Sequence, residues 1–486
     1  MILVSTPSVP AADPQGPPPG RESVFQVAPE SELLYSLGAD GRRRHIHPRV
    51  VKGRFWHARR NLGYALIALF VALPLVPIGG APAVFLDVAQ RQFHVLGSIF
   101  HPTDNLLLLA FGAGTIITVF FVGSIFGRLW CGFACPQNVY LEFIFRPIEI
   151  WLEGQRVAQR RLNEASWTWA KFGRKAAKWS LWALIALAMA TNFFAYFVSW
   201  SGIAAAWGDL ASHQALLGAI VAMAALIVFD LGWFRDQMCA IACPYGRLQN
   251  VLTDRDTVIP AYDARRGDPK GRPKKGEDRA AFGDCVNCTS CVQACPTGVD
   301  IRRGLQLECV ASGQCMDACN AVMAREGLPP GLIRYTSERE LETGERRFWR
   351  PRLFVYLALM TLAWGSLIVM LAGRGQALVE IVRSGHEPFH VNASGQVVNQ
   401  QRLRLTNQEN EPQSFHIELV SPPGAKLVVS SSSSLTVEPA EVRTVNIATE
   451  VPPQAFTNGQ VTGVYKVSSN HGFSRSYQFP LLGPNR

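Results

Sequence analysis

Charged residues are missing from five long stretches of this 486-residue chain. The uncharged stretches are 61–86, 105–127, 179–208, 210–229 and 353–373. Each matches the roughly 20 apolar residues that cross the hydrocarbon core of a bilayer. Their recurrence disfavours the buried helices of a large soluble protein, and it assigns the net charge of +10 to a membrane surface instead of a nucleic acid. We therefore expect a polytopic α-helical membrane protein with five transmembrane helices, a lipid bilayer around it and no nucleic-acid partner.

Lysine and arginine are scarce in alternate loops. Residues 41–60 contain eight of them and residues 128–178 contain nine, whereas residues 87–104 contain one. Basic loops stay on the cytoplasmic side of a membrane. In a bacterial inner membrane, this bias places the N-terminus and the 234–352 loop in the cytoplasm and the chain after about residue 374 in the periplasm.

A cleavable signal is also missing from the start of the chain. Residues 1–40 are rich in Pro, Gly and Ala and lack a basic start followed by an apolar run. We expect residues 1–60 to form a basic, disordered N-terminus on the cytoplasmic side. A membrane domain of four helices is expected to follow over residues 61–253.

Cysteine is absent from the predicted periplasmic region. All eleven cysteines lie between Cys131 and Cys319, in the predicted cytoplasmic loop or at cytoplasmic helix ends. Thiols on the reducing side of a membrane are expected to be metal ligands or redox groups and not disulfide bridges.

Residues 254–352 are predicted to hold a cytoplasmic linker and a bacterial-ferredoxin-like α+β cassette, before the fifth helix at 353–373. The first part, 254–282, is basic, contains Pro and Gly, and shows no apolar periodicity. This composition indicates a linker that lies along anionic headgroups.

The segment "CVNCTSCVQACP" contains four closely spaced cysteines. They are Cys285, Cys288, Cys291 and Cys295, separated by two, two and three residues, and Pro296 follows. In such a run three cysteines hold one [4Fe–4S] cluster and the fourth reaches a neighbouring cluster. A zinc site would need two separated pairs. The spacing therefore predicts an iron–sulfur cluster.

A second, altered run follows in "LECVASGQCMDACN". Cys309, Cys315 and Cys319 keep the ferredoxin spacing, but Ser312 stands where another cysteine is expected. Two-cluster ferredoxins exchange ligands between their two runs. The predicted ligands of the first cluster are Cys285, Cys288, Cys291 and Cys319, and those of the second are Cys295, Cys309 and Cys315 with Ser312 at the fourth position.

Ser312 leaves the nature of the second cluster open. A serine oxygen is a harder and more basic donor than a thiolate, so the iron beside it is expected to be labile. The alternatives are a [4Fe–4S] cluster with oxygen ligation, a [3Fe–4S] cluster, or no second cluster. Three ligands at unchanged spacing retain most of the chelate and favour a bound cluster.

Two further cysteine pairs have the form Cys-x-x-x-Cys-Pro at predicted helix ends. The first is Cys131 with Cys135 in "WCGFACP", and the second is Cys239 with Cys243 in "MCAIACP". A separation of four places both sulfurs of a pair on one helix face, and the proline ends or bends the helix. Thiolates select soft ions such as Cu(I). These four residues are predicted to bind copper, with a further cluster or a redox disulfide as alternatives.

Three charged residues near these pairs have open roles. Arg128 and Arg235 would lower the pKa of the thiols if they faced them, and would otherwise anchor the membrane interface. Asp230 marks either an ion path or a hydrated helix end.

Beyond Gly373 apolar and polar residues alternate. The alternating segments are 401–407, 414–420, 441–451 and 463–469, separated by Pro, Gly and Ser. Several short strands within about a hundred residues are typical of a small antiparallel sandwich. We expect residues 374–486 to form a periplasmic, all-β, immunoglobulin-like domain that acts as a spacer or docking surface.

The combination of "WCGFACPQ", "MCAIACPYGR", "AYDARRGDPKG" and "CVNCTSCVQACPTGVDIRRGLQLEC" with a sandwich tail resembles the FixG/RdxA/CcoG family of cytochrome oxidase accessory proteins, from about residue 40 onward. The resemblance implies two cubane clusters and the reduction of Cu(II) to Cu(I) at the inner membrane for maturation of cbb-type cytochrome c oxidase. The implied partners are an electron donor, copper-handling proteins and oxidase assembly proteins. Ser312 departs from the family pattern.

The residues and the resemblance suggest one mechanism and two alternatives. Clusters at Cys285 to Cys319 would pass an electron to Cu(II) near Cys131, Cys135, Cys239 and Cys243, and the thiolates would retain Cu(I). One alternative is a quinol-linked membrane ferredoxin that feeds a periplasmic enzyme. The other is a non-enzymatic assembly scaffold with structural clusters.

Overall fold

The computed structural model describes residues 46–484 except 79–80, 89–91, 101–104, 274–277, 305, 307, 348, 374, 376, 385–386, 410, 430–434 and 439–440. Of the N-terminus 1–60, expected to be disordered, residues 1–45 lie outside the described residues, and residues 54–60 are instead helical. The chain forms two compact units. The cassette unit comprises the described parts of Met1–Leu66, Thr118–Trp182 and Val228–Leu357, and the sandwich unit comprises those of Ile67–Ile117, Ala183–Ile227 and Ala358–Arg486.

Four helices in the described part of the chain are long and apolar enough to cross a membrane. They are α2 (Asn105–Phe126), α7 (Trp169–Gly208), α8 (Gln214–Ile227) with its π-helical continuation η4 (Val228–Phe234), and α14 (Pro351–Ala372). These helices coincide with four of the five uncharged stretches. The chain is therefore a membrane protein with several apolar helices.

The remaining stretch, 61–86, is helical only as far as Ala72, and it adds no further membrane-length helix to the four in the described residues. Helix α1 (Arg54–Ala72) starts inside the basic segment and ends before Pro74 and Pro77. Proline lacks an amide proton and clashes with the preceding helical turn, so the helix stops there. Short strands follow: β1 (Pro77–Ile78), β2 (Ala81–Pro82), β3 (Val84–Asp87), β4 (Gln92–Val95) and β5 (Ser98–Phe100).

Short helices connect the apolar helices within the cassette unit. They are α3 (Leu129–Phe133), α4 (Pro136–Tyr140), η3 (Leu141–Phe145), α5 (Arg146–Glu153), α6 (Arg156–Glu164), η5 (Met238–Ala242) and α9 (Pro244–Leu252). Buried ion pairs hold α5 in place, because Glu149 pairs with Arg235 at 2.7 Å and Glu153 pairs with Lys178 at 2.7 Å.

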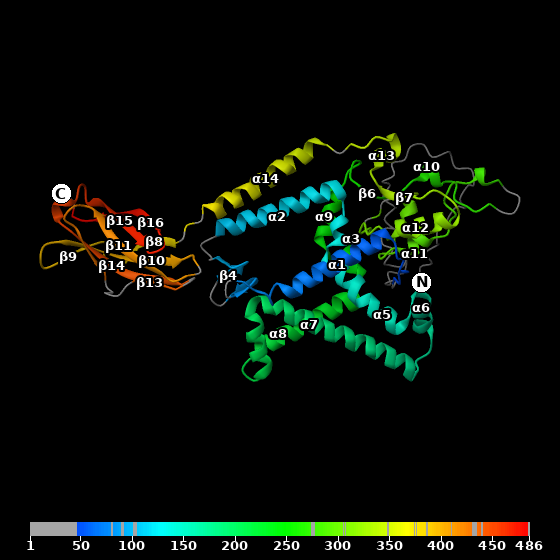
Figure 1. The fold of residues 1–486 in the computed structure, drawn as a ribbon, viewed down its shortest axis with the longest axis horizontal. Helices are drawn as coiled ribbons and strands as arrows, with labels where there is room; N and C mark the ends of the chain where they lie inside the picture. The colour runs from blue at the N-terminus through cyan, green and yellow to red at the C-terminus, as the bar shows by residue number, and fades with distance from the viewer. Residues whose placement is uncertain are drawn as a thin grey trace, which may run out of the picture. The chain divides into compact units, whose positions relative to one another are not determined.

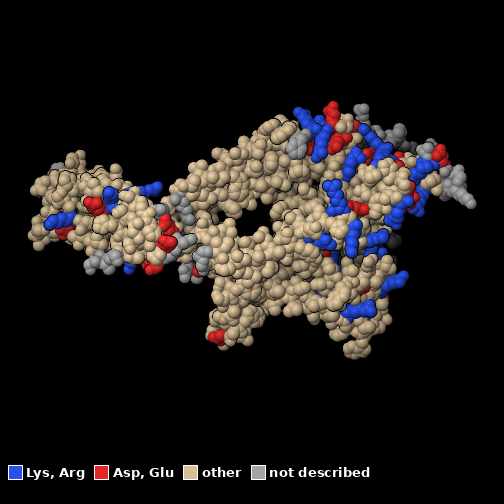
Figure 2. Space-filling view, in the orientation of Figure 1, with Lys and Arg blue, Asp and Glu red and all other residues tan. Residues whose placement is uncertain are grey.

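The cassette contains an antiparallel strand pair, β6 (Ile259–Tyr262) with β7 (Ile333–Thr336). Its helices are α10 (Ala264–Gly267), η6 (Arg279–Ala281), α11 (Ser290–Ala294), η7 (Ile301–Arg303), α12 (Gln314–Arg325) and α13 (Glu338–Thr343). All four residues of β6 are buried, which corrects the expectation that 254–282 is a linker throughout. Lys and Arg side chains are numerous on the surface of this region (Figure 2).

The C-terminal region is a sandwich of two antiparallel sheets (Figure 1). One sheet has the order β12-β14-β10-β8, with β9 also paired to β10, and the other has the order β13-β11-β15-β16. The strands are β8 (Ala377–Arg383), β9 (His390–Val391), β10 (Val397–Asn407), β11 (Gln413–Ser421), β12 (Lys426–Val429), β13 (Leu435–Val437), β14 (Val442–Val451), β15 (Gln460–Ser469) and β16 (Ser474–Leu482), with the turn η8 (Pro453–Ala455). Leu403 and Ile447 of one sheet and Phe415 and Val467 of the other share a buried core. The expected sandwich is therefore present.

Candidate metal centres

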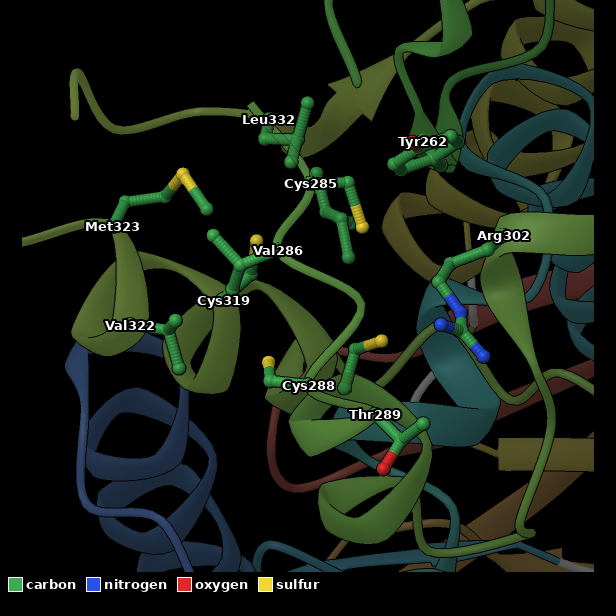
Figure 3. A pocket seen from close by; sticks show the side chains of 12 residues that line it. Tyr262, Cys285, Val286, Cys288, Thr289, Arg302, Cys319, Val322, Met323 and Leu332 are labelled. Carbon is green, nitrogen blue, oxygen red and sulfur yellow. The ribbon is translucent and has the colours of Figure 1, made fainter. Parts of the chain in front are cut away.

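The four cysteines expected to hold the first cluster line one cavity in the cassette. Cys285, Cys288, Cys291 and Cys319 line one partly open pocket. Figure 3 shows Arg302 on one side of this space and Met323 and Leu332 on another. Burial is the main cause that raises the pKa of Cys319 to about 12, and the neighbouring thiols of Cys285 and Cys288 add to the rise. Four soft donors around an apolar cavity are the set that an iron–sulfur cluster requires.

The loop of the second run has the same backbone conformation as the loop of the first. Asn287 and Thr289, two and four residues after Cys285, have positive φ angles of 52° and 54°. Ala311 and Gly313, two and four residues after Cys309, have positive φ angles of 50° and 73°. Left-handed backbone is uncommon for residues other than glycine, so its repetition indicates one loop design used twice. Ser312 occupies the position that Cys288 has in the first loop.

The three thiols expected to hold the second cluster, those of Cys295, Cys309 and Cys315, lie near one another. Burial, followed by Cys295, raises the pKa of Cys309 to about 11. Burial is the main cause that raises the pKa of Cys315, and the thiols of Cys309 and Cys295 add to the rise. Ser312 is buried, and Tyr335 donates a hydrogen bond to the carbonyl of Ala311 at 2.6 Å. The donor set is compatible with a second cluster that has three thiolates.

The CxxxCP cysteines, Cys131, Cys135, Cys239 and Cys243, flank short helices. Cys135 and Cys243 have extended backbone and precede α4 and α9, whose first residues are the motif prolines. Proline suits the first position of a helix, because its amide nitrogen needs no partner there. The expectation that both sulfurs of a pair share one helix face is therefore wrong, although each proline does mark a helix boundary.

The structure brings these four thiols together. Burial, followed by Cys135, raises the pKa of Cys131 to about 12. Burial raises the pKa of Cys239, and the other three CxxxCP cysteines add to that rise. In the described part of the chain, however, three or more His, Cys, Asp or Glu side chains do not converge closely enough to hold a metal ion. A mononuclear site needs metal–sulfur bonds of about 2.3 Å, so these side chains must turn inward to bind one.

The nearby charged residues have separate roles. Arg128 donates to the carbonyl of Gly246, and its charge opposes the rise in the pKa of Cys131. Arg235 instead pairs with Glu149 and lies over the ring of Trp182. Asp230 accepts a hydrogen bond at 3.1 Å from Gln137, which is two residues beyond Cys135.

Sequence reasoning missed two polar residues beside Cys131. The thiol of Cys131 donates to Oε1 of Gln249 at 3.3 Å. Nε2 of Gln249 donates to the hydroxyl of Tyr245 at 2.5 Å and to the carbonyl of Gly127 at 3.4 Å. Both residues belong to α9, the helix that begins at the proline of the second motif. Their place in the helix that follows "ACP" was the signal available in the sequence.

Replacing Gln249 by leucine is expected to lower the free energy of unfolding by about 1–3 kcal/mol, because buried partner groups lose their hydrogen bonds. Gln249 is fully buried. The variant should also react faster with iodoacetamide at Cys131, because the thiol loses its acceptor. Thermal unfolding and mass spectrometry of the alkylated chain measure the two effects. Tyr245→Phe removes one of these bonds and serves as the milder control. Equal alkylation of Cys131 in Gln249→Leu and the parent would show that Gln249 does not restrain this thiol.

Families with known chemistry match three parts of the chain. The 4Fe-4S dicluster domain matches residues 234–338, and the 4Fe-4S binding domain matches residues 106–156. The IG-like fold at the C-terminus of FixG matches residues 367–484. The chain therefore carries iron–sulfur domains and an immunoglobulin-like C-terminal domain.

Relatives with this organisation cover most of the chain. Protein RdxA of Cereibacter sphaeroides is 32% identical over 426 residues, which are 84% of this chain and 88% of RdxA. Protein RdxB of the same organism is 34% identical over 427 residues, 83% of this chain and 86% of RdxB. The nitrogen fixation protein FixG of Rhizobium meliloti is 26% identical over 465 residues, 86% of this chain and 88% of FixG. With its apolar helices, its iron–sulfur domains and these relatives, the chain belongs to the FixG/RdxA family of membrane redox proteins.

Proposed function

We propose that this protein is a membrane-bound cupric reductase that converts Cu(II) to Cu(I) and supports copper delivery during assembly of a cbb-type cytochrome c oxidase. The observation that carries the proposal is the packing of four mutually interacting thiols in the same compact unit as the iron–sulfur cassette. A one-electron source beside soft donors suits a metal that prefers sulfur once it is reduced.

The cassette residues hold the electron store in this proposal. Cys285, Cys288, Cys291 and Cys319 are the ligands of the first cluster, and Cys295, Cys309 and Cys315, with Ser312 at the fourth position, are those of the second. When bound, the clusters supply one-electron storage and transfer. The thiols must lose their protons on binding, and burial makes this deprotonation dependent on the metal.

The CxxxCP cysteines bind the substrate ion. Cys131, Cys135, Cys239 and Cys243 provide thiolates that favour Cu(I) over Cu(II), and Arg128 offsets part of their negative charge. In the net reaction Cu(II) gains one electron, and an external one-electron donor loses it by way of the cassette.

The membrane orientation and the partners belong to the same proposal. The excess of Lys and Arg in alternate loops supports a cytoplasmic cassette and a periplasmic sandwich in the bacterial inner membrane. The sandwich then faces the side on which copper-handling and oxidase assembly proteins would dock.

The test uses full-length protein purified without oxygen, reduced, freed of excess reductant and mixed with stoichiometric Cu(II). The EPR signals of the reduced clusters and of Cu(II) are expected to disappear together. Replacement of both Cys131 and Cys135 by serine should leave the reduced-cluster signal and the Cu(II) signal in place. Equal loss of Cu(II) signal in the variant would remove these cysteines from the reaction, and clusters that stay reduced in the parent would contradict cupric reduction.

One observation favours a second candidate, an electron-transfer subunit with a further cluster. The 4Fe-4S binding domain match covers 106–156, where the cysteines are Cys131 and Cys135. Iron analysis of the same double variant separates the two proposals. An unchanged iron content supports copper as the ion at these residues, whereas a lower content supports a cluster there.

A further inference from the structure

We propose that electrons leave the cassette at the contact between Gly132 and the 310–312 segment, with the first cluster site receiving them and the second passing them to the CxxxCP cysteines. This order rests on the proposed function and assigns a positioning role to Gly132.

The contact at Gly132 is formed by backbone on both sides. A Cβ atom at this position would lie 2.6 Å from the carbonyl oxygen of Val310 and 3.0 Å from Cα of Ser312. Real side chains do not approach other atoms so closely, so only glycine permits the two segments to meet. Nε of Arg59 donates to the carbonyl of Gly132 at 2.6 Å, and Arg59 is fully buried.

Each side of this contact carries a sulfur atom of a different site. Gly132 directly follows Cys131, and Val310 directly follows Cys309. The second cluster site and the CxxxCP cysteines are therefore joined by adjacent backbone.

The exposed Cys288 indicates where an electron can enter the cassette. Cys288 is exposed, whereas the other three cysteines of the first site are buried and Cys295, Cys309 and Cys315 of the second site are partly buried. Cys315 of the second site packs against the buried cluster that contains Cys285, Cys291 and Cys319 of the first site. An external donor can reach the first site, and the second lies between it and Gly132.

The tightness of the contact matters because electron transfer slows steeply as the gap between two redox groups widens. Cys295, Cys309 and Cys315 would hold a cluster that supplies one electron for each Cu(II) reduced to Cu(I), and a one-electron donor such as dithionite would supply that electron. Ser312 lies on the same segment, with its Cα at the contact with Gly132.

The experiment compares full-length Gly132→Ala with the parent in stopped-flow absorbance under anaerobic conditions. Reduction of the clusters by dithionite should be unchanged, and their reoxidation by stoichiometric Cu(II) should slow by about tenfold or more, since small misplacements of reacting groups have effects of this size. Hydrogen exchange at amides 310–313 should become faster, which reports the loosened contact independently of copper. The control is Gly173→Ala, because a Cβ at Gly173 meets nothing within 4 Å.

Arg59→Lys provides a second variant in case Gly132→Ala does not assemble its clusters. It keeps the charge and removes the Nε donor to Gly132, so reoxidation should again be the slowed step. Faster exchange at 310–313 with unchanged reoxidation would overturn the proposed route, and unchanged exchange would overturn the contact. If the parent itself is not reoxidised by Cu(II), the proposed function fails instead.

Discussion

Replacing Glu149 by glutamine is expected to lower the free energy of unfolding by about 3–5 kcal/mol, because it removes the carboxylate that pairs with the buried guanidinium of Arg235, whereas Lys178 keeps Glu153 at 2.7 Å. The carboxylate of Glu149 lies 2.7 Å from Nη2 of Arg235 and 3.5 Å from Nζ of Lys178. All three side chains are at most 7% exposed. Both cations also lie over the ring of Trp182, so they cannot turn toward water without losing that contact.

Thermal and denaturant unfolding in detergent, followed by circular dichroism, measures this loss. The matched control in the same unit is Glu342→Gln, because Glu342 pairs with Arg255 at the surface, where the side chains are 34% and 59% exposed. Exposed pairs contribute about 0–1 kcal/mol. Similar destabilisation by both variants would show that the Glu149 pair is not buried in the protein as folded.

Replacing Ser312 by cysteine is expected to make the second cluster resistant to loss of iron. The two cassette loops share their left-handed positions, so residue 312 corresponds to Cys288 and a cysteine there would complete the thiolate set. Thiolate holds iron more firmly than a serine oxygen. Mild oxidation with ferricyanide should produce a [3Fe–4S] EPR signal in the parent and a much weaker one in Ser312→Cys.

Ser312→Ala separates ligation from packing. If the serine oxygen binds iron, alanine should lose iron faster than the parent, as measured by metal analysis after oxidation. If the parent, alanine and cysteine proteins all lose iron at the same rate, residue 312 does not face the cluster, and the correspondence with Cys288 fails.

Local pattern was sufficient for the apolar helices and for much of the sandwich. The alternating segments 401–407, 414–420, 441–451 and 463–469 became β10, β11, β14 and β15. Strands such as β13, with three residues, are too short for their alternation to be recognised. Burial of one face of a long strand leaves a signal in sequence, whereas a short edge strand depends on its neighbour.

Two segments misled sequence reasoning because strand pairing defines them. Residues 77–86 are uncharged and mostly apolar, but prolines and pairing between strands replace the expected helix. Strand β6 sits among basic residues, Pro and Gly, and it is buried only because β7, from the other end of the cassette, pairs with it. Composition averaged over a window does not detect either effect.

Cysteine spacing and uncharged stretches are local properties of the chain. The soft ligands in ferredoxin spacing, the two CxxxCP pairs and the apolar helices can therefore be identified from the sequence without a fold. The contacts between these ligands and helices, in contrast, depend on the tertiary structure. Cys131 reaches Gln249 across 118 positions of sequence, and Gly132 meets the 310–312 segment through a gap that no side chain fits. Such contacts depend on the packing of segments far apart in the chain, and no local pattern encodes them.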